Sequence, residues 1–78
     1  MNLTNYQVTI LDKLIHGNGT GNVMEILNLT SDQLDEIFAI ANEMQNLNLV
    51  KLLYCNFNKN LVVVELTLFG KSEYNKNQ

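Results

Sequence analysis

Two side chains in this sequence of 78 residues are of the types that most often carry out covalent or acid–base chemistry. His16 is the only histidine, and it has no evident nucleophile as a partner. Cys55 is the only cysteine, and it lies in an apolar, strand-like stretch, where a small packing residue is the simpler interpretation. We therefore predict that the chain is not an enzyme and that it needs no cofactor.

Three carboxylates have a spacing that invites a comparison with metal sites. Asp32, Asp35 and Glu36 stand at positions i, i+3 and i+4, which adjoin one another on a helix surface. Their oxygens could hold a hard cation such as Mg²⁺ weakly, but a rigid helix surface rarely supplies enough ligands, and no loop motif accompanies them. A favourable interaction with the positive end of a helix dipole explains them more simply, so we predict no metal site.

The charges are divided unevenly along the chain, whose formal net charge is −3. Residues 1–50 carry six carboxylates against Lys13 alone, a balance of −5, and residues 51–78 carry four lysines against two glutamates, a balance of +2. The chain has no arginine. Because phosphate neutralisation supplies much of the affinity for DNA, only the last third of the chain could offer a phosphate-binding surface.

Length and composition predict one small soluble domain. Residues 1–74 are assigned to that domain and residues 75–78 to a disordered tail. A chain this short buries only about 60% of the surface that its unfolded form exposes, so we expect a marginal core and a homodimer. The single cysteine, the lack of a signal-like start and the lack of a membrane-length apolar run favour a cytoplasmic protein with no membrane partner.

Helical periodicity predicts three helices before residue 47. The first runs from Asn5 to His16 and begins with a Ser/Thr-x-x-Glu/Gln capping box formed by Thr4 and Gln7. After a glycine-rich loop and a very short strand near Thr20, a second helix runs from Asn22 to about Leu29. The third helix covers residues 32–46 and carries a wide apolar stripe on one face.

The rest of the chain predicts a hairpin and a short last helix. Strands over residues 49–57 and 61–67 flank a short turn, Asn58-Lys59-Asn60. Both faces of these strands carry apolar residues, which suggests that a second subunit or a partner covers one of them. A short helix could follow the second strand, to about Tyr74.

Three local signatures carry a resemblance to the winged helix-turn-helix family, of the small bacterial or phage regulator type. They span residues 27–34, 47–50 and 66–70; the last is Leu-Thr-x-x-Gly. In the second signature Asn48 stands where the family often has glycine, and asparagine tolerates the same left-handed backbone. The resemblance implies an α+β winged helix-turn-helix: three helices, then a two-stranded β-hairpin wing, after which a short C-terminal helix could follow.

The resemblance also implies a DNA-binding transcription regulator, with the third helix in the major groove and the wing on the phosphate backbone. Amide side chains read adenine, and lysines neutralise phosphates. A regulator of this kind would bind through wing lysines or as a dimer that pools them. The candidate DNA-binding residues are Gln33, Asn42, Asn46, Lys51, Lys59 and Lys71.

The charge pattern favours a different function, because the helix that would enter the DNA groove carries four carboxylates and no cation. The alternative is a protein-interaction module that presents this acidic face to a basic partner, for example a phage- or plasmid-type inhibitor that imitates the charge of DNA. Both functions stay open at this point. The candidate partner-binding residues are Asp32, Asp35, Glu36, Glu43, Phe57, Leu68, Phe69 and Tyr74.

Overall fold

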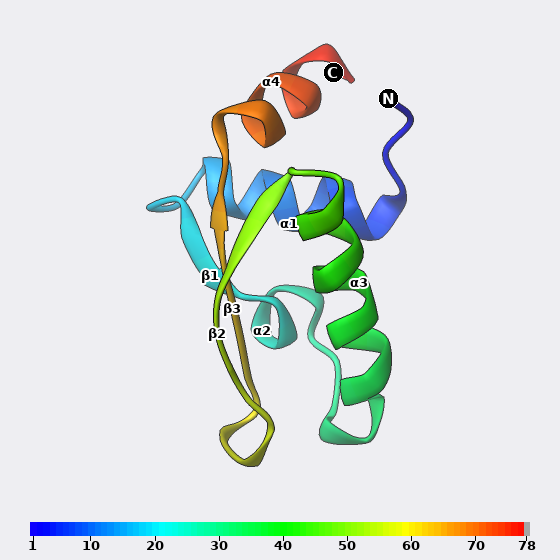
Figure 1. Ribbon diagram of the computed structural model, residues 1–78, viewed down its shortest axis with the longest axis vertical. Coiled ribbons are helices and arrows are strands. Elements are labelled where there is room, and N and C mark those ends of the chain that lie inside the picture. Colours follow the sequence, from blue (N-terminus) through cyan, green and yellow to red (C-terminus); the bar gives the residue numbers. More distant parts are fainter. Residues whose placement is uncertain (78) are drawn as a thin grey trace.

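Four α-helices and a three-stranded antiparallel sheet make up the α+β fold of the computed structural model, which describes residues 1–77 (Figure 1). Two 3-10 turns, Ser31–Gln33 and Phe57–Lys59, stand before the third helix and at the tip of the hairpin. The other elements, in chain order, are α1 (Asn5–Ile15), β1 (Thr20–Asn22), α2 (Val23–Leu27), α3 (Leu34–Asn46), β2 (Val50–Asn56), β3 (Leu61–Leu66) and α4 (Leu68–Lys76).

The sheet has the strand order β1-β3-β2, so the expectation of a two-stranded hairpin is wrong in strand number. The extra strand is the short segment expected near Thr20, which pairs with β3 through Thr20 and Glu65 at one end and Asn22 and Val63 at the other. The side chain of Asn22 also accepts a hydrogen bond of 2.9 Å from the backbone N–H of Val62. β3 is therefore held by strands on both of its edges.

One face of the sheet forms the floor of the hydrophobic core. In β3 the side chains alternate, with Val62 and Val64 fully buried and Glu65 exposed. α1, α2 and α3 contact the buried side (Figure 1). They contribute Leu11, Val23 and Ile37, each with no exposed surface, to the core. The opposite face of the sheet is open, since its residues are exposed or half-buried.

Local capping interactions set most of the helix boundaries. The predicted box at α1 is present: the Gln7 N–H donates to Thr4 Oγ1 at 3.2 Å, and the Thr4 N–H donates to Gln7 Oε1 at 3.0 Å. α3 ends at Asn46 as predicted, but residues 31–33 form a 3-10 turn, so the α-helix itself begins only at Leu34. Asn48 has the predicted left-handed backbone, with φ of 63°, and so do Asn28 and Asn60.

Residues 66–70 link the end of the sheet to α4 through several short contacts around Thr67 and Gly70. Thr67 is the N-cap of α4, and its Oγ1 accepts a 2.8 Å hydrogen bond from the Gly70 N–H. The same hydroxyl lies 2.9 Å from the carbonyl oxygen of Leu49, to which it can donate. A Cβ atom at Gly70 would overlap that carbonyl oxygen. The Leu-Thr-x-x-Gly segment is thus explained by a cap and a close backbone approach.

The expectation of a disordered tail from residue 75 is wrong for Asn75 and Lys76, which belong to α4. In this helix Glu73, only 4% exposed, lies between two cations: Lys76 Nζ at 3.1 Å and the Met1 amino group at 3.4 Å. The hydrogen bond from Lys76 and the nearby positive charges lower the pKa of Glu73, although its desolvation opposes them. Residue 78 lies outside the described residues. None of the described helices is long and apolar enough to cross a membrane.

We expect Gly70→Ala to destabilise the fold by at least about 2 kcal/mol, because the added methyl group has no space against the Leu49 carbonyl. For a domain of this size that loss lowers the melting temperature by about 10 °C, measurable by circular dichroism. Ser72→Ala, an exposed position on the same helix, is the control and should change stability by less than about 0.5 kcal/mol. Equal melting temperatures for the two variants would contradict this account of the glycine.

Candidate functional site

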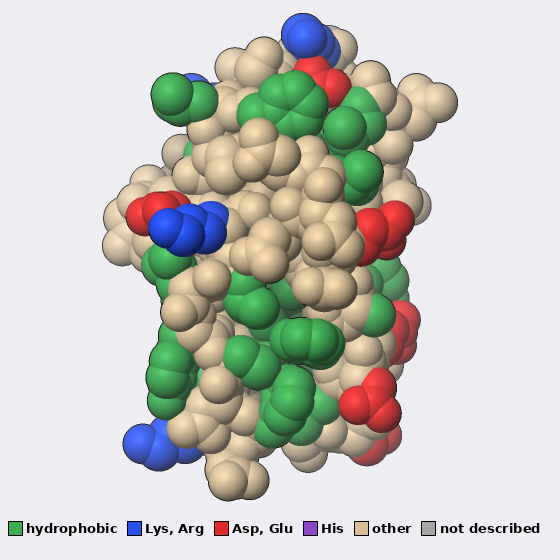
Figure 2. All heavy atoms as spheres, in the orientation of Figure 1, with side chains coloured by type: hydrophobic (Ala, Val, Ile, Leu, Met, Phe, Trp, Pro, Cys, Tyr) green, Lys and Arg blue, Asp and Glu red, His purple; other side chains and the backbone are tan. Residues whose placement is uncertain are grey.

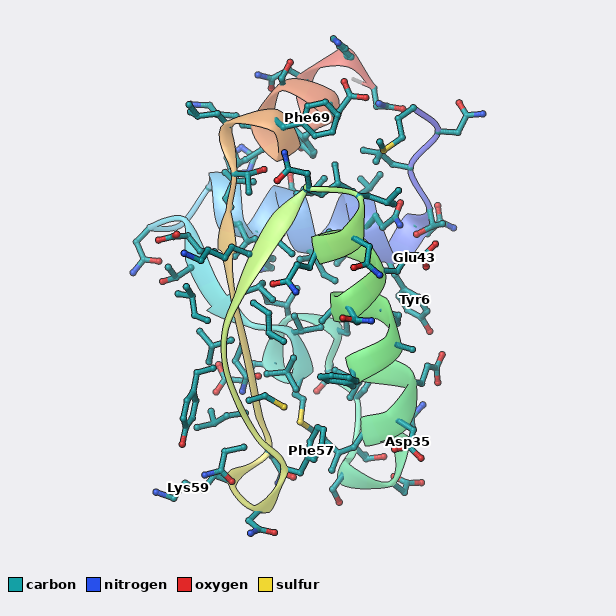
Figure 3. The ribbon with its side chains drawn as sticks, in the orientation of Figure 1. Tyr6, Asp35, Glu43, Phe57, Lys59 and Phe69 are labelled. Atoms are coloured by element: carbon teal, nitrogen blue, oxygen red, sulfur yellow. The ribbon has the colours of Figure 1, made fainter. Side chains whose placement is uncertain are left out.

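The exposed face of α3 and the 3-10 turn before it carry the acidic residues that the sequence analysis singled out. α3 turns Ile37, Ala41 and Met44 into the core, which leaves its other face to solvent. Asp35 and Glu43 point away from the hairpin along this face (Figure 3), and acidic side chains line this edge of the molecule (Figure 2). We call this surface the acidic face; its exposed carboxylates are Asp32, in the 3-10 turn, and Asp35, Glu36 and Glu43, on α3.

The carboxylates of the acidic face are not neutralised within the chain. Among residues 1–77 the ion pairs involve Asp12 and Glu73, and none involves a carboxylate of this face. A hydrogen bond from the Thr30 hydroxyl, followed by one from its own backbone N–H, lowers the pKa of Asp32. This carboxylate therefore stays ionised over a wider pH range than an ordinary aspartate. The face presents four negative charges that are free to meet an external cation.

An aromatic contact joins α3 to the tip of the hairpin. The rings of Phe38 and Phe57 meet edge to face, with centroids 5.7 Å apart and an interplanar angle of 82°. Phe38 is half-buried, and Phe57 is 46% exposed. Hydrophobic side chains gather on the surface between the hairpin and α3 (Figure 2), where Phe57 lies (Figure 3). We call the surface formed by Phe38 and Phe57 the apolar strip; it runs beside the acidic face.

A hydrogen bond from a side chain of α3 to the backbone of β2 holds the hairpin against this helix. Gln45 Oε1 accepts from the Leu52 N–H at 2.7 Å, which satisfies a backbone donor of β2, an outer strand of the sheet. Neither Gln45 nor Phe38 was among the residues predicted for a site. The signal that could have found Phe38 is its place on the border of the apolar stripe of the third helix.

The structure does not bring the candidate DNA-binding residues together on one surface. Lys59 lies at the hairpin tip (Figure 3), and Lys51 lies on the open face of the sheet, opposite Glu65 in the register. Lys71 is on α4, at the other end of a molecule that is 35 Å long (Figure 1). Asn42 and Asn46 are exposed on α3, whereas Gln33 is half-buried and accepts a 3.2 Å hydrogen bond from the Thr30 N–H.

The surroundings of Lys59 also limit its use as a phosphate contact. This lysine lines a shallow groove between the hairpin tip and α2, and Glu25 lines the same groove. The carboxylate of Glu25 therefore repels an anion that approaches Lys59 from this side. The contact that a wing makes with a phosphate backbone would have to come from the far side of the tip.

The candidate partner-binding residues outside α3 fall into two separate places. Phe57 belongs to the apolar strip, whereas Leu68 and Phe69, 89% and 41% exposed, begin α4 near the opposite end of the molecule. Tyr74 was predicted on a partner surface, and this prediction is wrong, because its side chain is only 8% exposed. α4 turns Tyr74 towards α1, where its hydroxyl donates a hydrogen bond to Asp12 Oδ1.

Cys55 and His16, the two residues of catalytic type, lie on different elements, β2 and the end of α1. Cys55 is half-buried in β2, and His16 is exposed at the end of α1, where its Nδ1 lies 2.9 Å from the carbonyl oxygen of Asp12. Residues 1–77 contain no group of three or more His, Cys, Asp or Glu side chains placed to hold a metal ion.

Comparisons with known proteins give no relatives. No protein-family model matches the chain, and no curated protein or solved structure matches it. The proposed function therefore rests on the acidic face and the apolar strip.

We expect the contact between Tyr74 and Asp12 to make the fold sensitive to alkali. The hydrogen bond to the carboxylate, then burial and the negative charge, raise the pKa of Tyr74 above its ordinary value of 10.0. The unfolded chain thus loses this proton at a lower pH than the folded chain, so stability holds below about pH 10 and falls as the pH rises further. Urea unfolding between about pH 8 and pH 11 measures this fall.

The Tyr74→Phe variant tests the cause, since it removes the titrating hydroxyl and leaves the ring. Its stability should be lower at neutral pH and decline less steeply in alkali than that of the unaltered chain. Tyr6→Phe is the matched control, because Tyr6 is exposed on α1. An alkaline decline with the same slope in both variants would show that Tyr74 is not responsible.

Proposed function

We propose that this chain is a non-enzymatic interaction domain of the winged-helix type that binds a basic protein surface through the exposed face of α3. One observation carries the proposal: the acidic face and the apolar strip lie side by side. Among residues 1–77 the four exposed carboxylates of the acidic face form no ion pair, and the strip consists of Phe38 and Phe57. Protein interfaces are typically built in this way, with an apolar centre and a polar rim.

The winged-helix assignment rests on the order and pairing of the elements. α2, a short turn and α3 follow one another as a helix-turn-helix would, and the β2–β3 hairpin follows α3 as a wing would. The strand near the start of α2 pairs with β3, so the hairpin is anchored to the helices. The cap at Thr67 and the close approach of Gly70 to Leu49 hold the start of α4 beside the start of β2, and α4 contacts α1.

Electrostatics favours a protein over duplex DNA as the partner of α3. A helix in the major groove lies between two rows of phosphates, and carboxylates on its exposed face would meet like charges there. A basic protein surface reverses the sign of that interaction. A partner that itself binds nucleic acid has the complementary charge, so the acidic face suits an inhibitor that occupies such a surface.

A cationic, apolar peptide is the direct probe of this surface. We expect a fluorescein-labelled peptide of alternating lysine and leucine to bind saturably, with an affinity that falls as salt screens the charges. Glu36→Lys should weaken binding at least about fivefold, because it replaces an attraction with a repulsion. Fluorescence anisotropy measures both effects.

The control for this experiment is Glu25→Lys, which changes the net charge by the same amount at an exposed carboxylate of α2, outside the acidic face. It should change the affinity by less than about twofold. Equal weakening by Glu36→Lys and Glu25→Lys would mean that the peptide responds only to net charge, and it would overturn the assignment of the surface. Loss of the apolar contribution in Phe57→Ser, with the fold retained, would support the role of the strip.

A second candidate function, a DNA-binding regulator, is favoured by the helix-turn-helix order together with exposed Asn42 and Asn46 on α3 and Lys59 at the hairpin tip. In this function a dimer would pool the lysines of two hairpins to compensate for the carboxylates. Asn42 and Asn46 would then supply the amide groups that read adenine.

Duplex DNA separates the two candidates. If the acidic face is a protein-binding surface, anisotropy of random-sequence duplex DNA should show no binding at about 50 mM salt, where non-specific binding is strongest. Micromolar binding that collapses at about 200 mM salt and is lost in Lys59→Glu, but not in Lys71→Glu, would instead establish the regulator. Lys71 is the suitable control because α4 lies at the far end of the molecule from the hairpin tip (Figure 1).

A further inference from the structure

The open face of the sheet is a second unpartnered surface, and it lies away from the acidic face of α3. Its rows follow from the register: Lys51 stands opposite Glu65, Tyr54 opposite Val63, and Asn56 opposite Leu61. Cys55 and Val62, which alternate with these positions, belong to the side that faces the helices. The open face is thus charged at one end, apolar around Tyr54 and Val63, and polar near the hairpin tip, where the Asn56 side-chain amide donates a 3.0 Å hydrogen bond to the Tyr54 hydroxyl.

The open face carries large apolar side chains that are exposed to solvent. A bulge at Leu53 places two residues of β2, Leu53 and Tyr54, against Val63 alone. Leu53 is 47% exposed and Tyr54 is 48% exposed, although both are large side chains. Val63 and Leu61 are half-buried beside them. Leu53 and Tyr54 lie on β2, at the edge of the sheet, where exposed apolar surface favours association.

The charged end of the open face, formed by Lys51 and Glu65, is complementary to the same face of a second copy of the chain. Lys51 and Glu65 are direct cross-strand neighbours, yet within residues 1–77 neither takes part in an ion pair. A two-fold axis in the interface, parallel to the strands and between β2 and β3, would set Lys51 of one copy opposite Glu65 of the other. The same axis sets Tyr54 opposite Val63 and Asn56 opposite Leu61.

We propose that two copies of this chain form a symmetric dimer by packing the open faces of their sheets together around such an axis. Aligned sheets pack about 10 Å apart, a distance that the side chains of Tyr54 and Val63 can fill. The paired rows bury apolar surface in the centre and place two ion pairs, each between Lys51 and Glu65, at one end. The contact involves mainly two short strands, so we expect a weak, reversible dimer.

This dimer does not rest on the function proposed for α3, because it uses the other side of the molecule. Sedimentation velocity between about 10 µM and 1 mM brackets weak association. The apparent mass should rise with concentration from 8.9 kDa towards twice that value. Glu36→Lys, on the acidic face, should leave the association unchanged, so a failure of one proposal is distinguishable from a failure of the other.

A charge-exchange experiment tests the position of the axis. Lys51→Glu alone and Glu65→Lys alone each place like charges opposite one another in the dimer, so each variant should associate at least about tenfold more weakly. An equimolar mixture of the two should recover association, because each copy then meets the opposite charge at both positions. Lys71→Glu is the control for net charge, and Tyr54→Ser should weaken association without any change of charge.

Circular dichroism melting of every variant establishes that the monomers remain folded. Recovery in the mixture, with no effect of Lys71→Glu, would support the proposed dimer. A chain that sediments as a monomer at every concentration would overturn it, and so would an association that none of Lys51→Glu, Glu65→Lys and Tyr54→Ser weakens. In that last case the copies meet through another surface, such as the exposed start of α4 at Leu68 and Phe69.

Discussion

The pairing of β3 on both of its edges is the constraint on which the rest of the structure depends. Because its residues alternate, Val62 and Val64 enter the core while their neighbours reach the other face. The inward residues position the three helices that pack on them. The outward residues define the surface that we assign to a second copy. A shift of this strand by one residue would exchange the two faces, and both the core and the surface would be lost.

Sequence reasoning succeeded where the determining interactions are local. The capping box at Thr4, the end of α3 at Asn46 and the left-handed Asn48 each depend on residues within one or two turns. It failed where the partner is remote. The pairing of the three-residue strand β1 with β3 spans about forty residues, and the burial of Tyr74 depends on Asp12 at the other end of the chain.

The sequence also predicted the candidate site in part: it identified the acidic residues but not the apolar contacts beside them. The exposed carboxylates of α3 follow from helical periodicity, which places them opposite the apolar stripe. The bulge at Leu53 and the contact between Phe38 and Phe57 could not be predicted, since they depend on how the hairpin twists and folds back on α3. The result is a molecule with two unrelated outward surfaces: a helix face with a single sign of charge, and a sheet face with balanced charges and apolar rows.

The three left-handed asparagines have a consequence for the unfolded chain. Asn28, Asn48 and Asn60 each adopt a positive φ at a turn. Each is followed by a leucine that is buried or half-buried. Glycine would adopt the same geometry with less strain, but a glycine samples many more conformations before folding. With asparagine at these three turns, the domain loses less backbone entropy on folding than it would with glycine there. The apolar burial of its small core therefore has a smaller entropy cost to offset.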